Sequence, residues 1–158
     1  MSRAETVKKP SAPEARTPGA TRAGPDDHVF NFGEIDPIQG GPDYSPVFGG
    51  CVEGDRMIVG LMRAPAGKMG DPHNHPNEQW IYVIEGNFEI RIKGKAHVVA
   101  PQGLIYIPAE EIHQGGATAD ADCVFFTCKD SSHGLQGIRV PGGKAYADAP
   151  VLPRKAKV

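Results

Sequence analysis

The chain has 158 residues, enough for one domain with a hydrophobic core but too few for two domains of ordinary size. Its 17 basic and 19 acidic side chains give a formal net charge of -2, which excludes the strong basic excess typical of proteins that bind nucleic acids or anionic membranes. No apolar run approaches the roughly 18 residues that a membrane helix needs, and the N-terminus lacks the apolar core of a secretory signal. We therefore expect a soluble cytoplasmic protein with no nucleic-acid or membrane partner.

The cysteine pattern agrees with a reducing compartment. Cys51, Cys123 and Cys128 make an odd number without the dense spacing of a disulfide scaffold. Cys123 and Cys128 are five residues apart in an apolar run, so in a strand they point to opposite faces and should not pair with each other.

Composition divides the chain into a tail and a domain. Residues 1–27 mix Pro, Ala, Gly, Thr and charged residues with almost no bulky apolar side chains. Such a segment buries too little surface to offset its ordering entropy, so we predict a disordered tail. The domain is predicted to span residues 28–158, with its core at about residues 47–130.

From residue 28 onward, short runs rich in Val, Ile, Phe and Tyr alternate with turns that contain Gly, Pro and Asp. This texture predicts an all-β fold, an antiparallel sandwich or barrel with almost no helix. A two-residue connection, Gly86-Asn87, suggests a tight hairpin between two of the strands. The predicted strands are Val47–Val52, Met57–Arg63, Gln79–Glu85, Phe88–Lys93, Lys95–Val99, Leu104–Ile107 and Asp122–Lys129.

The strand that begins at Gln79 is apolar on both faces. Gln79, Ile81 and Val83 share one face, and Trp80 and Tyr82 lie on the other. A strand with one face in water should not show this pattern, so a second layer or a partner subunit should cover the Trp80 face. We expect a homodimer.

Three histidines are candidate metal ligands. His73 and His75 are two residues apart in a polar segment, and His113 begins a later strand. In a small antiparallel barrel these imidazoles can converge on one point, and three neutral imidazoles suit Fe, Mn, Ni, Zn, Co or Cu.

The segment "GKMGDPHNHPNEQWIYVIEG" resembles the first motif of the cupin family, G-x5-H-x-H-x3-E-x6-G, from Gly67 to Gly86. The segment "PQGLIYIPAEEIH" is similar to the second cupin motif, which ends at His113. The resemblance covers roughly residues 47–130 and implies a single jelly-roll barrel with a divalent metal inside its wider end. It implies His73, His75 and His113 as metal ligands.

Gln79 occupies the position of the family's carboxylate ligand, and Glu78 comes one residue earlier. Neighbouring strand residues point to opposite faces, so only one of the two can face the barrel interior. Turning Glu78 inward would turn Ile81 and Val83 outward, and we therefore expect Gln79 to complete the site. Three imidazoles and an amide leave the metal its full positive charge, which favours an anionic substrate.

Two kinds of chemistry remain open for such a centre. Three-His sites resemble those of cupin dioxygenases that use Fe²⁺, and this activity on a small enolisable or carboxylated molecule is the one we favour. A ligand set of three histidines and Gln79 resembles that of cupins that act on unsaturated uronic acids without redox chemistry. In such a lyase or isomerase the metal is a Lewis acid. The favoured cofactor is Fe²⁺, with Mn²⁺, Ni²⁺, Zn²⁺ and Co²⁺ as alternatives.

A non-catalytic cupin that binds a small metabolite or a metal is the third possibility, because fold alone does not determine activity. Three further side chains are candidates for substrate binding. Arg63 is in phase with apolar Leu61, Tyr106 lies near the second motif, and His133 follows the last core strand in a loop that could cover the barrel opening.

Overall fold

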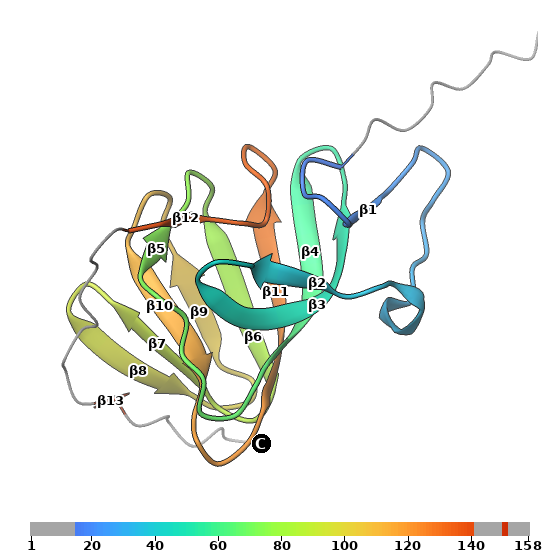
Figure 1. Ribbon diagram of the computed structural model, residues 1–158. Helices are drawn as coiled ribbons and strands as arrows, with labels where there is room; N and C mark the ends of the chain where they lie inside the picture. Colours follow the sequence, from blue (N-terminus) through green and yellow to red (C-terminus); the bar gives the residue numbers. More distant parts are fainter. Residues whose placement is uncertain (1–14, 141–149, 152–158) are drawn as a thin grey trace, which may run out of the picture.

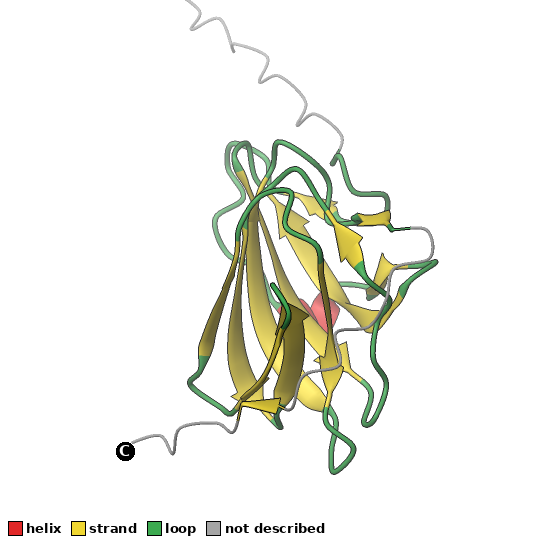
Figure 2. Cartoon of the chain, turned by 90° about the vertical axis from the view of Figure 1, so that its left-hand side faces the viewer, coloured by secondary structure: helices red, strands yellow, loops and turns green. Residues whose placement is uncertain are grey.

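The computed structural model describes residues 15–140 and 150–151, which form two sheets that face each other (Figures 1 and 2). Sheet one has the order β1-β3-β4-β11-β6-β9, with β2 also paired to β3; sheet two has the order β12-β5-β10-β7-β8-β13. The strands of sheet one are β1 (Thr21–Arg22), β2 (Ile38–Gly41), β3 (Ser45–Glu53), β4 (Met57–Ala64), β6 (Gln79–Glu85), β9 (Leu104–Ile107) and β11 (Cys123–Asp130). Those of sheet two are β5 (His73–Asn74), β7 (Phe88–Ile92), β8 (Lys95–Val99), β10 (His113–Ala117), β12 (Ile138–Arg139) and β13 (Pro150–Val151).

The all-β prediction is confirmed. Among the described residues the one helical element is the short 3-10 helix η1 (Phe32–Glu34). All seven predicted strands are present, with ends shifted by a few residues at most. The structure adds β10, which begins at His113 as expected, and the short strands β1, β2, β5, β12 and β13. Pairing between the described strands is antiparallel except for two short parallel contacts, β1 with β3 and β13 with β8.

The link between β6 and β7 is not the expected hairpin. β6 pairs with β11 and β9, whereas β7 pairs with β10 and β8 in the other sheet. Gly86, with φ of +70°, lets the chain cross between the sheets, and a Cβ at this position would lie 2.1 Å from the carbonyl oxygen of Asp122. The sequence pattern could not separate the two cases, because both strands turn an apolar face to the same core whether they pair or cross.

The core fills the space between the two sheets. Phe88 of β7 and Phe125 of β11 meet edge to face across it, with ring centroids 5.1 Å apart. Inward residues of β6 are almost fully buried: Ile81 is 3% exposed and Val83 is 0% exposed. Burial of these side chains from both sheets provides the main driving force for closing the barrel.

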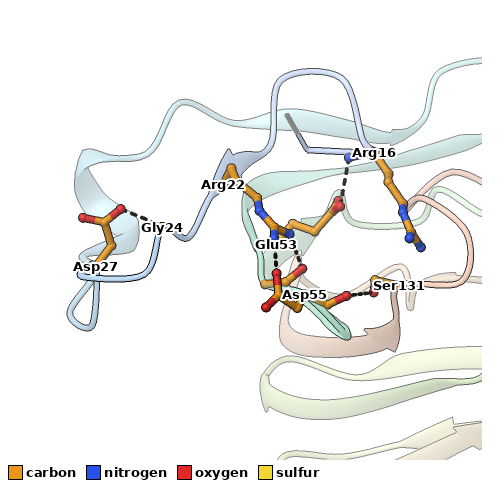
Figure 3. Close-up of polar contacts among 8 residues, drawn as sticks. Arg16, Arg22, Gly24, Asp27, Glu53, Asp55 and Ser131 are labelled. Atoms are coloured by element: carbon orange, nitrogen blue, oxygen red, sulfur yellow. Dashed lines mark hydrogen bonds and ion pairs between the residues drawn. The ribbon is translucent and has the colours of Figure 1, made fainter. Parts of the chain in front are cut away.

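The tail predicted for residues 1–27 is too long. Thr17 is 1% exposed, and its backbone N–H donates a hydrogen bond to the buried carboxylate of Glu53 at 3.3 Å. The same carboxylate accepts a hydrogen bond from the backbone N–H of Arg16 at 2.8 Å (Figure 3). Further along, Arg22 forms an ion pair with Asp55. Composition did not reveal this segment because polar bonds to buried groups hold it, rather than bulky apolar side chains.

Residues 1–14, the rest of the predicted tail, lie outside the described residues. The three cysteines are free, as predicted, with Cys51 and Cys123 buried. Within the described part of the chain, no helix is long and apolar enough to cross a membrane.

The outer face of β6 and its neighbour β9 is apolar and open in the single chain. Trp80 is 42% exposed, Tyr82 43% and Leu104 59%. Trp80 packs against Tyr106 of β9, with ring centroids 4.7 Å apart. No layer of the described chain covers these side chains, so of the two coverings expected from the sequence, a partner subunit stays a prediction.

Candidate metal centre

Strand pairing at one end of the barrel brings three histidines together. His73 of β5 is the register partner of His113, the first residue of β10. His75 follows two residues after His73, so an extended backbone turns both imidazoles the same way. One ring nitrogen of each histidine lies within 4.8 Å of those of the other two. His75 is 1% exposed and His113 is 3% exposed, so the cluster is shielded from solvent.

Backbone carbonyls determine the tautomer of each histidine. Each Nδ1 lies within hydrogen-bond distance of a carbonyl oxygen, and a carbonyl can only accept, so each Nδ1 must carry the proton. The three Nε2 atoms are then left with lone pairs, which is the state in which imidazole binds a metal. The distance from Nδ1 to the carbonyl oxygen is 2.9 Å for His73 and Asp71, 2.7 Å for His75 and Asn77, and 2.8 Å for His113 and Glu111.

Gln79 faces the histidines from the first position of β6. Its Nε2 donates to Oγ1 of Thr127 at 2.8 Å, and the Thr127 hydroxyl donates in turn to the carbonyl oxygen of Trp80 at 3.0 Å. This chain of bonds fixes the orientation of the amide. The Gln79 Oε1 atom consequently lies 3.1 Å from Nε2 of His75.

The contact between Gln79 and His75 therefore brings two lone pairs face to face. His75 donates through Nδ1, so its Nε2 has no proton to give, and the amide oxygen has none either. Such a contact is unfavourable unless a proton or a cation lies between the two atoms. Burial lowers the pKa of His75 to about 4, helped by the positive charge of Lys129, so a proton does not occupy this position at neutral pH.

Burial has the same effect on the other two histidines. It lowers the pKa of His73 to about 4 and, together with the charge of His73, lowers the pKa of His113 to about 2. All three imidazoles are neutral at pH 7, and protons do not compete for their lone pairs. Three imidazole nitrogens and one amide oxygen match the donor chemistry of a divalent transition metal.

The predicted direction of Gln79 is confirmed, and Glu78 points away from the barrel interior. Gln79 is 9% exposed, whereas Glu78 is exposed and accepts a hydrogen bond from the Tyr106 hydroxyl at 3.0 Å on the outer surface. Metal binding by His73, His75, His113 and Gln79 stays a prediction, which the arrangement of their donor atoms supports.

The three substrate-binding candidates do not lie in the cavity beside the histidines. Arg63 is exposed on the outer face of β4, where it pairs with Asp122 at 3.2 Å. It is in phase with Leu61, as expected, but that phase faces outward because Met62 and its alternate residues fill the core. Tyr106 is on the outer face of β9, and His133 does not line the cavity.

A cavity opens beside the cluster and is lined mainly by apolar side chains. It is bounded by His73, His113 and Gln79, by Thr127 and Lys129 of β11, and by residues of both sheets. No Asp or Glu is among its lining residues. The apolar lining residues are Val47, Met62, Ile81, Phe88, Ile90, Ile107, Phe125 and Leu135.

Sequence reasoning missed three residues of this site: Thr127, which holds the Gln79 amide, Tyr44 and Lys129. Tyr44 stacks on His73, with ring centroids 4.2 Å apart, and its hydroxyl accepts a hydrogen bond from the backbone N–H of Gly137. Lys129 is 4% exposed and lines the cavity. Alternation along β11 could have found Lys129, because it is in phase with the inward residues Phe125 and Thr127. No comparable local signal marks Tyr44.

The fold and the site define a small jelly-roll barrel with a cluster of three histidines at one end. Residues 60–128 match the family model of the cupin domain. This match over part of the chain supports the resemblance to the cupin superfamily that the two sequence motifs indicate. No curated protein matches it in sequence.

Several solved structures share the fold. The polyketide cyclase RemF from Streptomyces resistomycificus is 20% identical, with a TM-score of 0.62 over 72% of this chain and 84% of the other. KdgF from Halomonas sp. is 21% identical, with a TM-score of 0.57 over 65% of this chain and 94% of its own. A predicted oxalate decarboxylase from Thermotoga maritima is 18% identical, with a TM-score of 0.57 over 65% of this chain and 98% of the other.

Proposed function

We propose that this protein is a metal-dependent enzyme that binds a divalent transition metal through His73, His75, His113 and Gln79 and acts on a small anionic molecule. The observation that carries the proposal is the contact between His75 Nε2 and Gln79 Oε1, which lie 3.1 Å apart with a lone pair on each atom. A cation that accepts both lone pairs removes the repulsion between them. The His75 ring is held through Nδ1 by the Asn77 carbonyl, and the Gln79 amide is held through Nε2 by Thr127, and this arrangement turns the two lone pairs toward each other.

The donor set favours Lewis-acid chemistry. All four donors are neutral, so a bound divalent ion keeps its full charge and can stabilise an enolate or a carboxylate on the substrate. Most side chains that line the cavity are apolar, and an apolar environment strengthens this electrostatic effect. A lyase, isomerase or cyclase without redox chemistry is the activity that this arrangement supports best.

The names of two structural neighbours are compatible with this proposal. One is a polyketide cyclase and another is a predicted oxalate decarboxylase. Their identities to this chain are 20% and 18%, so they support the fold, and the chemistry is argued from the residues of this site.

An Fe²⁺ dioxygenase is the second candidate, favoured by a different observation. The cavity lining has no carboxylate that could act as a general acid or base. Oxygenase chemistry, in which substrate and dioxygen meet at the metal, depends less on such a group. The three histidines and Gln79 leave room in a six-coordinate shell for two further ligands.

Metal content and two assays separate these candidates. Full-length protein is loaded anaerobically with Fe²⁺ or Zn²⁺, and bound metal is counted by elemental analysis. Oxygen uptake is then measured with diketone, thiol and hydroxy-aromatic compounds, and exchange of enolisable protons with D₂O is followed by NMR. Proton exchange with the Zn²⁺ form supports Lewis-acid catalysis, and oxygen uptake by the Fe²⁺ form alone supports the dioxygenase.

Matched variants test the ligand set itself. Gln79→Ala should weaken metal binding, whereas Glu78→Ala should leave it unchanged because that side chain lies outside the barrel. His113→Ala should abolish stoichiometric binding. A wild-type chain that takes up no metal, or a larger effect at Glu78 than at Gln79, would exclude the proposed site.

A further inference from the structure

Lys129 is the one cationic side chain that lines the cavity. It lies near the end of β11, where the alternation that turns Phe125 and Thr127 inward also turns Lys129 inward. In the strand register its partner on β6 is Gln79, so the two residues start from adjacent backbone positions. The lysine side chain is therefore built into the same end of the barrel as the histidines.

The ammonium group of Lys129 has more hydrogen-bond donors than partners among the described residues. Its Nζ donates one hydrogen bond, to the carbonyl oxygen of Leu135 at 2.6 Å, and an ammonium has three donors. No ion pair within the described chain includes Lys129. The neighbouring Asp130 binds the backbone N–H groups of Glu78 and Ser132 instead.

An unpaired cation in an apolar wall is costly, because burial removes its hydration without replacing it. A divalent metal at the nearby histidines adds to the cost, since two positive centres then share a cavity without a carboxylate. Both costs fall when an anion enters between them. A lysine at this position therefore serves a ligand better than it serves the empty barrel.

We propose that Lys129 forms an anion-binding subsite, which holds the carboxylate of the substrate while a second oxygen of the same molecule faces the metal ligands. The subsite deepens the proposed function and rests on it for the metal. With four neutral ligands, a divalent metal brings two positive charges to the cavity, and Lys129 adds a third when it is protonated. The fitting substrate class is a small carboxylic acid with an enolisable or ionisable oxygen nearby and an apolar remainder that contacts Phe88, Ile90 and Phe125.

This assignment replaces Arg63 as the carboxylate anchor expected from the sequence. Arg63 lies on the outer face and already has Asp122 as its partner, whereas Lys129 is buried, faces the cavity and has donors to spare. The buried position also makes its contribution larger, because a charge-assisted bond is screened less inside the barrel than at the surface.

The test uses full-length protein loaded with Zn²⁺, with 2-oxobutyrate as the anionic probe and its amide as the neutral probe, both measured by titration calorimetry. Lys129→Met removes the charge, and Lys129→Gln removes it while keeping a donor for Leu135. Lys95→Met, at an exposed position of β8, removes one positive charge outside the cavity and is the control. Bound zinc is counted in every sample.

We expect both Lys129 variants to bind 2-oxobutyrate about ten- to a hundred-fold more weakly than wild type, the loss of one charge-assisted bond. Binding of the amide should not change, and Lys95→Met should behave as wild type. Equal binding of 2-oxobutyrate by all forms would overturn the subsite, as would an equal loss of acid and amide, which indicates a structural role, or no binding by wild type.

The metal and the subsite can fail separately. If the protein binds no zinc, the proposed function is wrong, and the subsite is then judged from the metal-free protein. There, 2-oxobutyrate should raise the melting temperature of wild type more than that of Lys129→Met. Equal shifts in the two metal-free proteins would overturn the subsite as well.

Discussion

Thr127 tests how the site is organised, because its hydroxyl forms hydrogen bonds to Gln79 and to the Trp80 carbonyl and none to the three histidines. It accepts a bond from Gln79 Nε2 at 2.8 Å and donates to the Trp80 carbonyl at 3.0 Å. Replacing Thr127 with Val keeps the shape of the side chain and removes both bonds. The Gln79 amide then loses the partner that turns its oxygen toward His75.

Two effects of Thr127→Val can be estimated. A buried N–H left without an acceptor costs about 1–3 kcal/mol of stability. Loss of a group that orients a metal ligand lowers metal affinity by about ten- to a hundred-fold, or about 1.4–2.7 kcal/mol. Thr127 is 2% exposed, so water cannot easily take over the lost bonds.

Zinc affinity is measured by competition with a chromophoric chelator, and stability by urea denaturation of the metal-free protein. Thr127→Ser retains the hydroxyl and should bind zinc nearly as wild type does. Thr118→Val removes a hydroxyl whose partner, Asp120, is exposed and is the surface control. If Thr127→Val bound zinc as tightly as wild type, Thr127 would not orient the amide, and the argument from facing lone pairs would fail.

Three further predictions concern acid, the N-terminal segment and assembly. Burial holds the pKa values of the three histidines at about 4 or lower, below the value of about 6.5 in the unfolded chain, so unfolding takes up protons between these limits. As the pH falls from 6.5 to 4, the free energy of unfolding of the metal-free protein should fall by about 1.4 kcal/mol per pH unit for each proton taken up. Equal urea midpoints at pH 7 and pH 5 would contradict this. Glu53→Ala leaves the N–H groups of Arg16 and Thr17 without their acceptor, so proteolysis within residues 15–22 should become faster, while the Zn²⁺ affinity of the distant cluster stays unchanged. The expected homodimer should dissociate in Tyr82→Lys, as measured by sedimentation equilibrium, and a monomeric wild type would show that the apolar outer face is not a dimer contact.

Much of the site could be predicted because it depends on local spacing. Two histidines two residues apart face the same way in an extended segment, and strand alternation is enough to turn Gln79 inward and Glu78 outward. These are short-range consequences of backbone geometry. Lys129 follows the same alternation, but a lysine in a β-strand usually points to solvent, so the residue type gives no sign of its inward position.

The sequence could not predict contacts whose cause lies far along the chain. Arg63 keeps its alternation with Met62, but which of the two phases faces the core depends on how β4 lies between β3 and β11. Gly86 marks a turn in either case, and only the pairing of β6 with β11 and of β7 with β10 shows that the chain crosses between sheets there.

Periodicity and motif spacing are local properties of the backbone, and they were enough to predict an all-β barrel with histidines and an amide at one site. Tertiary structure decided which lone pairs meet, which cation is left without a partner and which residues close the cavity. Those features arise where β11, β6 and β10 come together, and burial there sets the charge state of each group. That is why the candidate metal ligands could be named from the sequence, while Thr127 and Lys129 became apparent in the folded chain.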